Sequence, residues 1–207
     1  MNKKKLVIFD VDGVLFDSLK NMETAWKYTT NKFHINVGFD NYVKYLGLPF
    51  IAILQNLGIN SKKKEIQKYY QLISEKNLNL IIPFKQAQKT IGLLNKYQVK
   101  TAICTSKDFQ RTKKILNKYN LKFDAIEADI NNQKKGKPHP DKVLSILDKL
   151  KIDKKYSVYI GDMYIDYLTA RNAKIDYLHA GWGYSKINQN VTILNSMNEG
   201  LDYVEMK

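Results

Sequence analysis

The feature that most constrains this chain is residues 6–18, where four apolar residues run directly into the carboxylates of Asp10 and Asp12. An uninterrupted apolar run followed by Asp and Gly predicts a strand buried in a parallel sheet, and then a turn. Open α/β sheets place their sites at the carboxyl ends of such strands. We therefore expect one carboxylate to attack an electrophile and hold a metal, while the other moves a proton.

The composition is that of a globular protein with excess positive charge. The chain has 207 residues, 44% of them hydrophobic, and a net charge of +14. Its lysines are scattered and only Arg111 and Arg171 are arginines, whereas nucleic-acid readers use arginine for bidentate contacts. This pattern disfavours a nucleic-acid partner, although a positive field would still attract a phosphate-bearing substrate.

The sequence predicts neither an export signal nor a membrane span. Its apolar runs are too short to cross a bilayer, and the run after the basic residues 3–5 is too short for a signal peptide. Cys104 is the lone cysteine, so no internal disulfide can form, which agrees with a reducing compartment. We expect a cytoplasmic monomer or homodimer with no membrane partner.

Two kinds of periodicity divide the chain. Between residues 18 and 82 apolar side chains recur at helical spacing, without strand-like alternation. From residue 83 onward helical stretches alternate with short apolar runs, which predicts a doubly wound α/β fold with a mainly parallel sheet. The insert would be a small all-helical cap after the first strand, over 17–83, on a Rossmann-like catalytic core made of 1–16 and 84–207. The later strands are expected at 99–104, 124–127, 156–160 and 175–179.

A third acidic position follows the strand expected at 156–160, where Asp162 stands after Gly161. In a parallel sheet this loop meets Asp10 and Asp12 at one edge. Carboxylates that converge without a cation repel one another, and a hard divalent cation with oxygen ligands, best Mg²⁺, relieves that repulsion. The expected ligands are the side chains of Asp10 and Asp162 and the backbone carbonyl of Asp12.

Hydroxyl groups and a lysine supply what a phosphate needs. Thr105 and Ser106 follow the strand expected at 99–104, where hydroxyls and backbone N–H groups can hold phosphate oxygens. Lys137, in the loop before the helix that precedes the strand at 156–160, can balance the remaining charge. Carboxylates, Mg²⁺, lysine and hydroxyl together point to phosphoryl transfer.

Four segments, in this order, resemble the motifs of the haloacid dehalogenase superfamily in its helical-cap phosphatase branch. Residues 180–184 also resemble phosphoglycolate-phosphatase-like members. The resemblance covers nearly the whole chain and, because Asp12 is present, favours phosphate over halide chemistry. The four segments are 10–14 (DVDGV), 104–107 (CTSK), 137–140 (KPHP) and 161–166 (GDMYID).

The resemblance implies a role for each site residue. Asp10 would form an aspartyl-phosphate, and Asp12 would protonate the leaving alcohol and then activate water. Thr105 and Lys137 would bind the phosphoryl group, and Asp162 would ligate Mg²⁺. Asp166 would act from outside the metal's coordination sphere, orienting Lys137 or a metal-bound water.

The substrate stays open at this level. We expect a small soluble phosphomonoester, such as a sugar phosphate, phosphoglycolate or a short alcohol phosphate, with Lys20, Lys44 and Gly47 of the cap as candidate specificity residues. One alternative is a phosphomutase like beta-phosphoglucomutase, weakened because Met22 stands where such members usually carry histidine. The other is a non-enzymatic, basic nucleic-acid-associated or scaffolding protein on the same fold.

Overall fold

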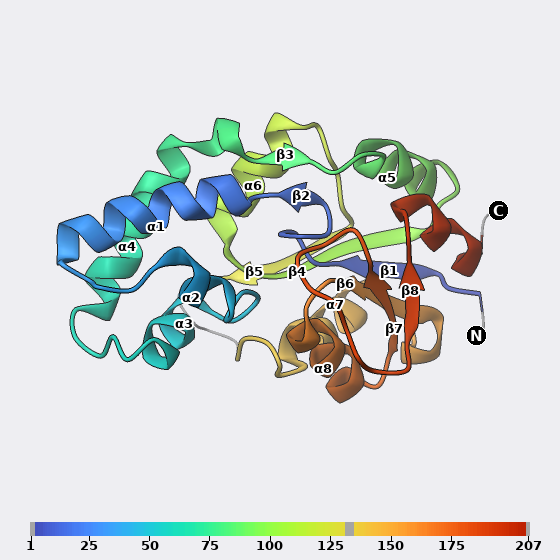
Figure 1. Cartoon of the computed structure of the whole chain (residues 1–207). Coiled ribbons are helices and arrows are strands. Elements are labelled where there is room, and N and C mark those ends of the chain that lie inside the picture. The colour runs from blue at the N-terminus through green and yellow to red at the C-terminus, as the bar shows by residue number, and fades with distance from the viewer. Residues whose placement is uncertain (1–2, 131–134, 206–207) are drawn as a thin grey trace.

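The computed structural model describes residues 3–130 and 135–205, and a six-stranded parallel sheet lies at its centre (Figure 1). The strand order is β5-β4-β1-β6-β7-β8, with every neighbouring pair parallel. The doubly wound α/β fold predicted from the sequence is confirmed. The strands are β1 (Leu6–Phe9), β4 (Lys100–Asp108), β5 (Ala125–Asp129), β6 (Ser157–Gly161), β7 (Asp176–Ala180) and β8 (Thr192–Leu194).

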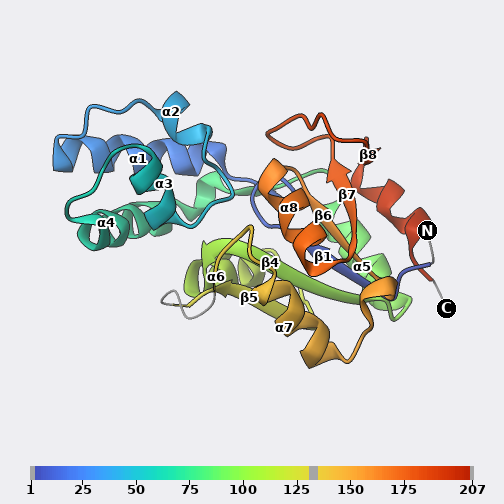
Figure 2. The ribbon, with the colours of Figure 1, turned by 90° about the horizontal axis from the view of Figure 1, so that it is seen from below.

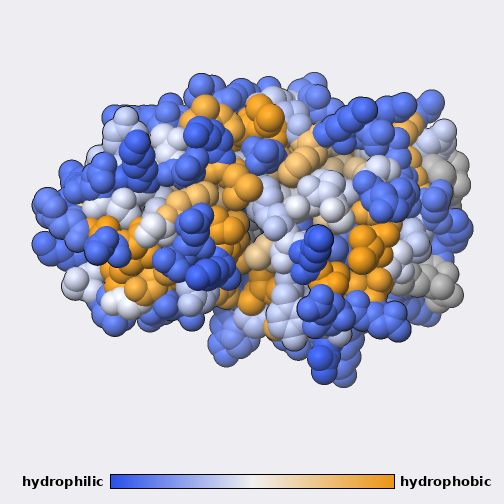
Figure 3. Space-filling model, in the orientation of Figure 1, coloured by the Kyte–Doolittle hydropathy of each residue, from blue (hydrophilic) through white to orange (hydrophobic). Residues whose placement is uncertain are grey.

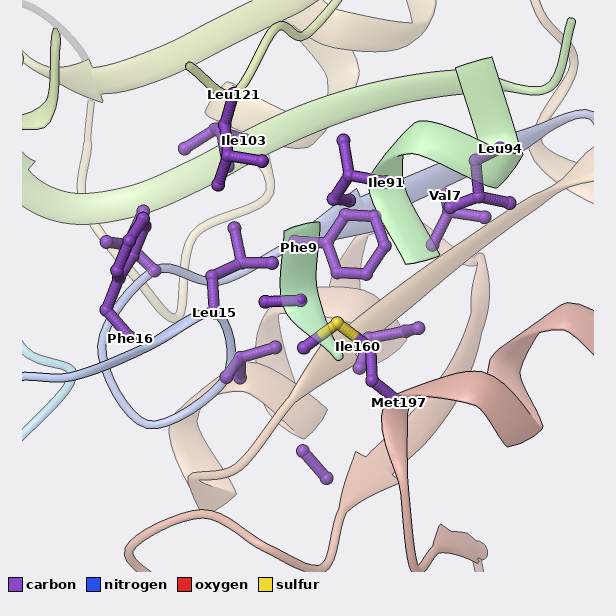
Figure 4. Packing of buried hydrophobic residues seen from close by; sticks show 14 of the residues in the cluster. Val7, Phe9, Leu15, Phe16, Ile91, Leu94, Ile103, Leu121, Ile160 and Met197 are labelled. Atoms are coloured by element: carbon purple, nitrogen blue, oxygen red, sulfur yellow. The ribbon is translucent and has the colours of Figure 1, made fainter. Parts of the chain in front are cut away.

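Helices cover both faces of this sheet, which explains why β1 is apolar at every position. Val7 and Phe9 pack into a cluster with side chains of α5 (Ala87–Lys96), α6 (Phe109–Lys118) and the 3-10 segment η3 (Met197–Tyr203), as Figure 4 shows. Leu6 and Ile8 face the opposite cluster, with α7 (Asp141–Leu150) and α8 (Tyr164–Ala173). Successive strand residues point to opposite faces, so a strand covered twice needs apolar side chains throughout.

A second, helical part lies beside the carboxyl edge of the sheet (Figures 1 and 2). It has its own apolar cluster around Trp26, Tyr42 and Leu54. In Figure 3 hydrophobic residues of this part reach the surface around α2 and α3, whereas hydrophilic residues cover most of the molecular rim. Its elements are α1 (Leu19–Phe33), α2 (Phe39–Val43), α3 (Phe50–Asn56), α4 (Lys63–Lys76) and the 3-10 turn η1 (Leu78–Leu80).

The chain passes between the two parts through a pair of very short strands that the sequence did not predict. β2 (Phe16–Asp17) and β3 (Ile82–Pro83) pair antiparallel. Two residues are too few to show an alternating pattern. This pair brings the entrance and the exit of the helical part side by side.

Two further differences concern the strands of the main sheet. β8 was not expected, because it is a three-residue edge strand whose central Ile193 is 49% exposed. β4 continues through Thr105 and Ser106 to Asp108, with a register irregularity between Cys104 and Asp108. No helix among the described residues is both long and apolar enough to span a membrane.

Candidate active site

The site lies at the carboxyl edge of the sheet, where the neighbouring strands β4, β1 and β6 end. Asp10 follows β1 directly, and Asp162 follows β6. The remaining predicted residues converge on this edge as well, as described below. Asp10, Thr105 and Asp162 are each no more than 3% exposed, so their polar groups act in a largely water-excluded environment.

Lys137 joins two of the carboxylates. Its Nζ lies 2.8 Å from Asp10 Oδ1 and 2.6 Å from Asp166 Oδ1. The other oxygen of Asp166 accepts a hydrogen bond from the Met163 backbone N–H, and Tyr159 donates to Oδ1 at 3.2 Å. Both oxygens of Asp166 are therefore engaged, which suits a residue that positions the lysine better than one that coordinates a metal.

The acidic cluster fits a divalent cation. Carboxylate oxygens of Asp10, Asp162 and Asp166 lie within 4.8 Å of one another. Among the described residues, the buried Oδ1 of Asp162 has no hydrogen-bond partner. Asp10 Oδ1 likewise lacks a hydrogen bond of good geometry, despite the nearby ammonium of Lys137. Buried carboxylate oxygens without donors are what an oxygen-seeking cation such as Mg²⁺ requires.

The electrostatics of the acidic cluster also favour a bound divalent cation. Burial raises the pKa of Asp10 to about 7, although the Lys137 ammonium opposes the rise. Burial also raises the pKa of Asp162 well above its usual value, reinforced by the charges of Asp166 and Asp10. The protein alone thus leaves these groups short of positive charge, and a bound cation would supply it.

Gly13 allows the turn after β1 to pass against Asp162. Its φ is +83°, and a Cβ at this position would lie 2.1 Å from Asp162 Oδ2. The same oxygen accepts a hydrogen bond from the Tyr184 backbone N–H at 2.8 Å. Only glycine adopts this positive φ without strain and also leaves space for the Asp162 carboxylate. The structure therefore explains why the first motif contains a glycine.

A pocket of about 60 Å³ opens between the sheet edge and the helical part. Ligand pockets for drug-sized molecules are typically about 300–1,000 Å³, so this one suits a small group. Asp10 and Asp12 lie in its wall together with Thr105, Ser106 and Gly47. The helical part adds mainly apolar and aromatic side chains, from Met22, Tyr42, Leu46, Leu48, Phe50, Ile53 and Tyr70.

Among the residues that the structure describes, the side-chain contacts of the Asp12 carboxylate are to one of its two oxygens. Ser18 Oγ donates a short hydrogen bond to Asp12 Oδ1. The Nζ of Lys107 lies 3.1 Å from the same oxygen, and its side chain is only 4% exposed. Both contacts leave Asp12 Oδ2 for another partner.

Thr105 and Ser106 differ in their surroundings. The carbonyl of Thr105 accepts a hydrogen bond from the buried ammonium of Lys142 at 2.7 Å. The hydroxyl of Ser106 donates to the carbonyl of Gly47 at 2.6 Å. Ser106 thus joins the sheet edge to the helical part, and Lys142 adds a second buried lysine beneath the position predicted to bind phosphate.

Of the three residues of the helical part proposed for specificity, one lines the pocket and two do not. Gly47 lies in the pocket wall. Lys20 and Lys44 do not line the pocket. Lys20 contacts Glu23 and Lys44 contacts Asn41, both within the helical part. The basic residues that line the pocket are Lys107 and Arg111, which both come from the sheet part.

Sequence reasoning missed Lys107, Arg111, Lys142 and the contacts of Tyr184. The Tyr184 hydroxyl accepts from the Ser18 N–H at 2.7 Å, so the segment after β7 links Asp162 to the chain crossing. For Lys107 the signal was its place directly after Thr105 and Ser106. Nothing in the sequence distinguished Lys142 from its many neighbouring lysines.

A model of haloacid dehalogenase-like hydrolases matches residues 7–180. The chain belongs to this family. The assignment made from four motifs is confirmed, and with it the prediction of a phosphatase-type hydrolase. The phosphoglycolate phosphatase of Aquifex aeolicus is 28% identical over 90% of this chain and 89% of its own.

Other relatives extend over nearly the whole length. A pyrophosphatase PpaX of Halalkalibacterium halodurans is 23% identical, with 97% of each chain covered. The crystal structure of a hydrolase from Pseudomonas syringae superposes with a TM-score of 0.85 at 22% identity, with 98% of each chain covered. At this identity the superposition shows that the family's fold is shared.

Proposed function

We propose that this chain is a Mg²⁺-dependent phosphatase that hydrolyses a small phosphomonoester through an aspartyl-phosphate on Asp10. The observation that carries the proposal is that Asp10 and Asp12 face one small pocket, with Lys137 against Asp10 and Thr105 in the same wall. The names of the relatives, phosphoglycolate phosphatase and pyrophosphatase, support phosphate chemistry.

The first half-reaction transfers the phosphoryl group to the protein. A carboxylate oxygen of Asp10 attacks phosphorus, the bond between phosphorus and the ester oxygen breaks, and Asp12 gives its proton to the departing oxygen. Lys137 and the polar groups at Thr105 bind the phosphoryl oxygens and offset the charge that accumulates on them. In the second half-reaction Asp12 takes a proton from water, whose oxygen attacks phosphorus and frees Asp10 and inorganic phosphate.

Mg²⁺ would be held by the carboxylates of Asp10 and Asp162 and by the backbone carbonyl of Asp12. When bound, the cation would supply the positive charge that lets an anionic nucleophile approach an anionic phosphate. Asp166 keeps Lys137 in place through their 2.6 Å contact.

The helical part would act as a cap on this reaction. We propose that residues 17–83 move as one unit on the β2–β3 pair, relative to a core made of 1–16 and 84–207. Support comes from the separate apolar cluster of the helical part and from the adjacency of its two connections. Closure over the bound substrate would exclude bulk water from the site.

The pocket favours hydrolysis of a small ester over the phosphomutase alternative. A mutase must hold a sugar that bears phosphate at either end, and about 60 Å³ leaves little room for it. Incubation with a hexose 1-phosphate should therefore form no 6-phosphate, and accumulation of that isomer would favour the mutase.

The test of the phosphatase is Mg²⁺-dependent release of phosphate from p-nitrophenyl phosphate. The Asp10→Asn variant should lose about 1,000-fold or more in kcat because it removes the nucleophile. Asp148→Asn makes the same chemical change on a side chain that is 82% exposed, and it should keep full activity. Comparable rates for Asp10→Asn and the wild-type enzyme would refute the proposed mechanism.

A further inference from the structure

Lys107 and Arg111 are the basic side chains in the pocket wall, and they differ in how far they are already engaged. The Arg111 guanidinium donates a short hydrogen bond from Nε to Asp108 and one from Nη1 to Ser74 Oγ at 2.6 Å. It therefore fastens α6 to the helical part. Lys107 pairs with one side chain, that of Asp12, so more of its donor capacity remains for a ligand.

The ammonium of Lys107 has few partners for so buried a group. Lysine is almost never fully buried unless it is paired, and it carries three N–H donors. Lys107 pairs with Asp12 Oδ1 at 3.1 Å, and among the described residues its ammonium has no other hydrogen-bond partner, so part of its donor capacity remains. Burial lowers its pKa, while the Asp12 charge opposes that effect. Such an ammonium gains from an anionic acceptor supplied by a ligand.

The position of Lys107 determines where on the substrate that acceptor would lie. In the proposed reaction Asp12 gives its proton to the ester oxygen, and Oδ2 is the oxygen that Ser18 and Lys107 leave free. Lys107 therefore stands beside the ester oxygen of the leaving group. A substituent on the atom next to that oxygen is within its reach.

The rest of the pocket offers little to a polar leaving group. The helical part contributes Met22, Leu46, Phe50 and Ile53, which have no polar side-chain group for a sugar hydroxyl. It also contributes Tyr42 and Tyr70, whose hydroxyls already bond to each other at 3.1 Å. A polyol or sugar would leave hydroxyl groups unpaired there. A short leaving group whose polar function sits next to the ester oxygen meets Lys107 and avoids that penalty.

We propose that Lys107 is a specificity-determining residue that binds a second anionic group beside the scissile oxygen. Two kinds of substrate carry such an anionic group. It is the carboxylate in a short phosphorylated α-hydroxy acid and the second phosphate in pyrophosphate. The proposal rests on the phosphatase function proposed above. Lys107 is distinct from Lys137, which serves the transferred phosphoryl group.

The experiment compares kcat/KM for three substrates of similar size. 2-Phosphoglycolate carries the carboxylate, pyrophosphate carries the second phosphate, and 2-hydroxyethyl phosphate is a neutral analogue of the first. The wild-type enzyme should prefer at least one of the two acids over the neutral ester by about 10- to 100-fold, as expected for a charged hydrogen bond. Which acid is preferred identifies the source of the anion.

Two variants assign this preference to the side chain. Lys107→Gln should reduce the preference to about threefold or less, mainly by raising KM for the acid, and Lys107→Arg should restore part of it because the charge returns. Lys151→Gln removes the same charge from a side chain that is 80% exposed, and it should keep the preference. Thermal unfolding of each variant shows whether it is folded.

The outcomes separate this inference from the function on which it rests. Equal efficiency of the wild-type enzyme on all three substrates, or an equal loss on all three in Lys107→Gln, would overturn the inference while the phosphatase stands. The first of these outcomes needs no variant to fold. Absence of Mg²⁺-dependent hydrolysis of every phosphate tested, including p-nitrophenyl phosphate, would overturn the phosphatase and the inference together.

Discussion

The hydroxyl of Ser106 donates a hydrogen bond to the carbonyl of Gly47 at 2.6 Å, across the boundary between the sheet and the helical part. A residue expected to hold phosphate thus binds the loop of the helical part that lines the pocket. Gly47 has a φ of +87°, and a Cβ there would lie 2.6 Å from Ile165 Cγ2. Both residues therefore control how closely the cap approaches the core.

The first prediction separates these two roles. Ser106→Ala removes one hydrogen bond, worth about 1 kcal/mol, so kcat/KM should fall severalfold while inhibition by inorganic phosphate is unchanged. Gly47→Ala adds a clash and backbone strain, so its loss should exceed tenfold. Steady-state kinetics measure both, with Ser61→Ala on the exposed cap surface as the control. Weaker phosphate inhibition in Ser106→Ala would instead assign Ser106 to phosphate binding.

The second prediction concerns the hydroxyl of Tyr184. Tyr184→Phe leaves the buried N–H of Ser18 without its acceptor, which costs about 1–3 kcal/mol. Because Ser18 also holds Asp12, kcat should fall together with the free energy of unfolding. Urea titration and steady-state kinetics report the two effects. Tyr164→Phe, on a side chain that is 49% exposed, should change neither kcat nor the free energy of unfolding. Unchanged kcat and stability in Tyr184→Phe would contradict the role proposed for this hydroxyl.

The third prediction concerns Lys142, whose ammonium donates to the Thr105 carbonyl. Lys142→Met removes this donor and a buried positive charge near the part of β4 where we propose that phosphate binds. KM and the inhibition constant of inorganic phosphate should both rise about 3- to 10-fold, with a smaller change in kcat. Lys151→Met, on an exposed side chain directly after the same helix, is the control. Unaltered phosphate inhibition in a folded Lys142→Met variant would restrict Lys142 to packing.

The fourth prediction is a pH dependence of stability at Asp108. Burial favours its neutral form, but the Arg111 guanidinium outweighs this and lowers the pKa of Asp108. A lowered pKa means that the stabilisation is complete above the unfolded pKa of 3.8 and is lost as the pH falls through the folded value. Asp108→Asn should retain the N-cap, so only the charge contribution disappears.

Denaturation as a function of pH measures this contribution. The difference in unfolding free energy between wild type and Asp108→Asn should be about 1 kcal/mol at pH 6 to 7. It should shrink as the pH falls below about 4. Asp148→Asn, whose side chain is 82% exposed, should show no such trend. A difference that stays constant down to pH 2 would rule out the ion pair as its source.

The motifs and the fold were predictable because they depend on local patterns. β1 is apolar at each position because both faces of the sheet are covered, and its carboxylates follow from the strand's end. Lys142 was not predictable, since its burial arises only when α7 packs beneath β4. The outward positions of Lys20 and Lys44 follow from the rotation of the cap helices about their axes, which depends on packing.

The short β2–β3 pair affects which part of this fold can change in sequence independently of the rest. Because the insertion enters and leaves at one point, its sixty-odd residues can change without altering any pairing in the main sheet. Lys107 and Arg111, however, belong to β4 and α6. A chimera with a foreign cap would inherit the size and shape limits of the donor but keep this core's attraction to acidic leaving groups.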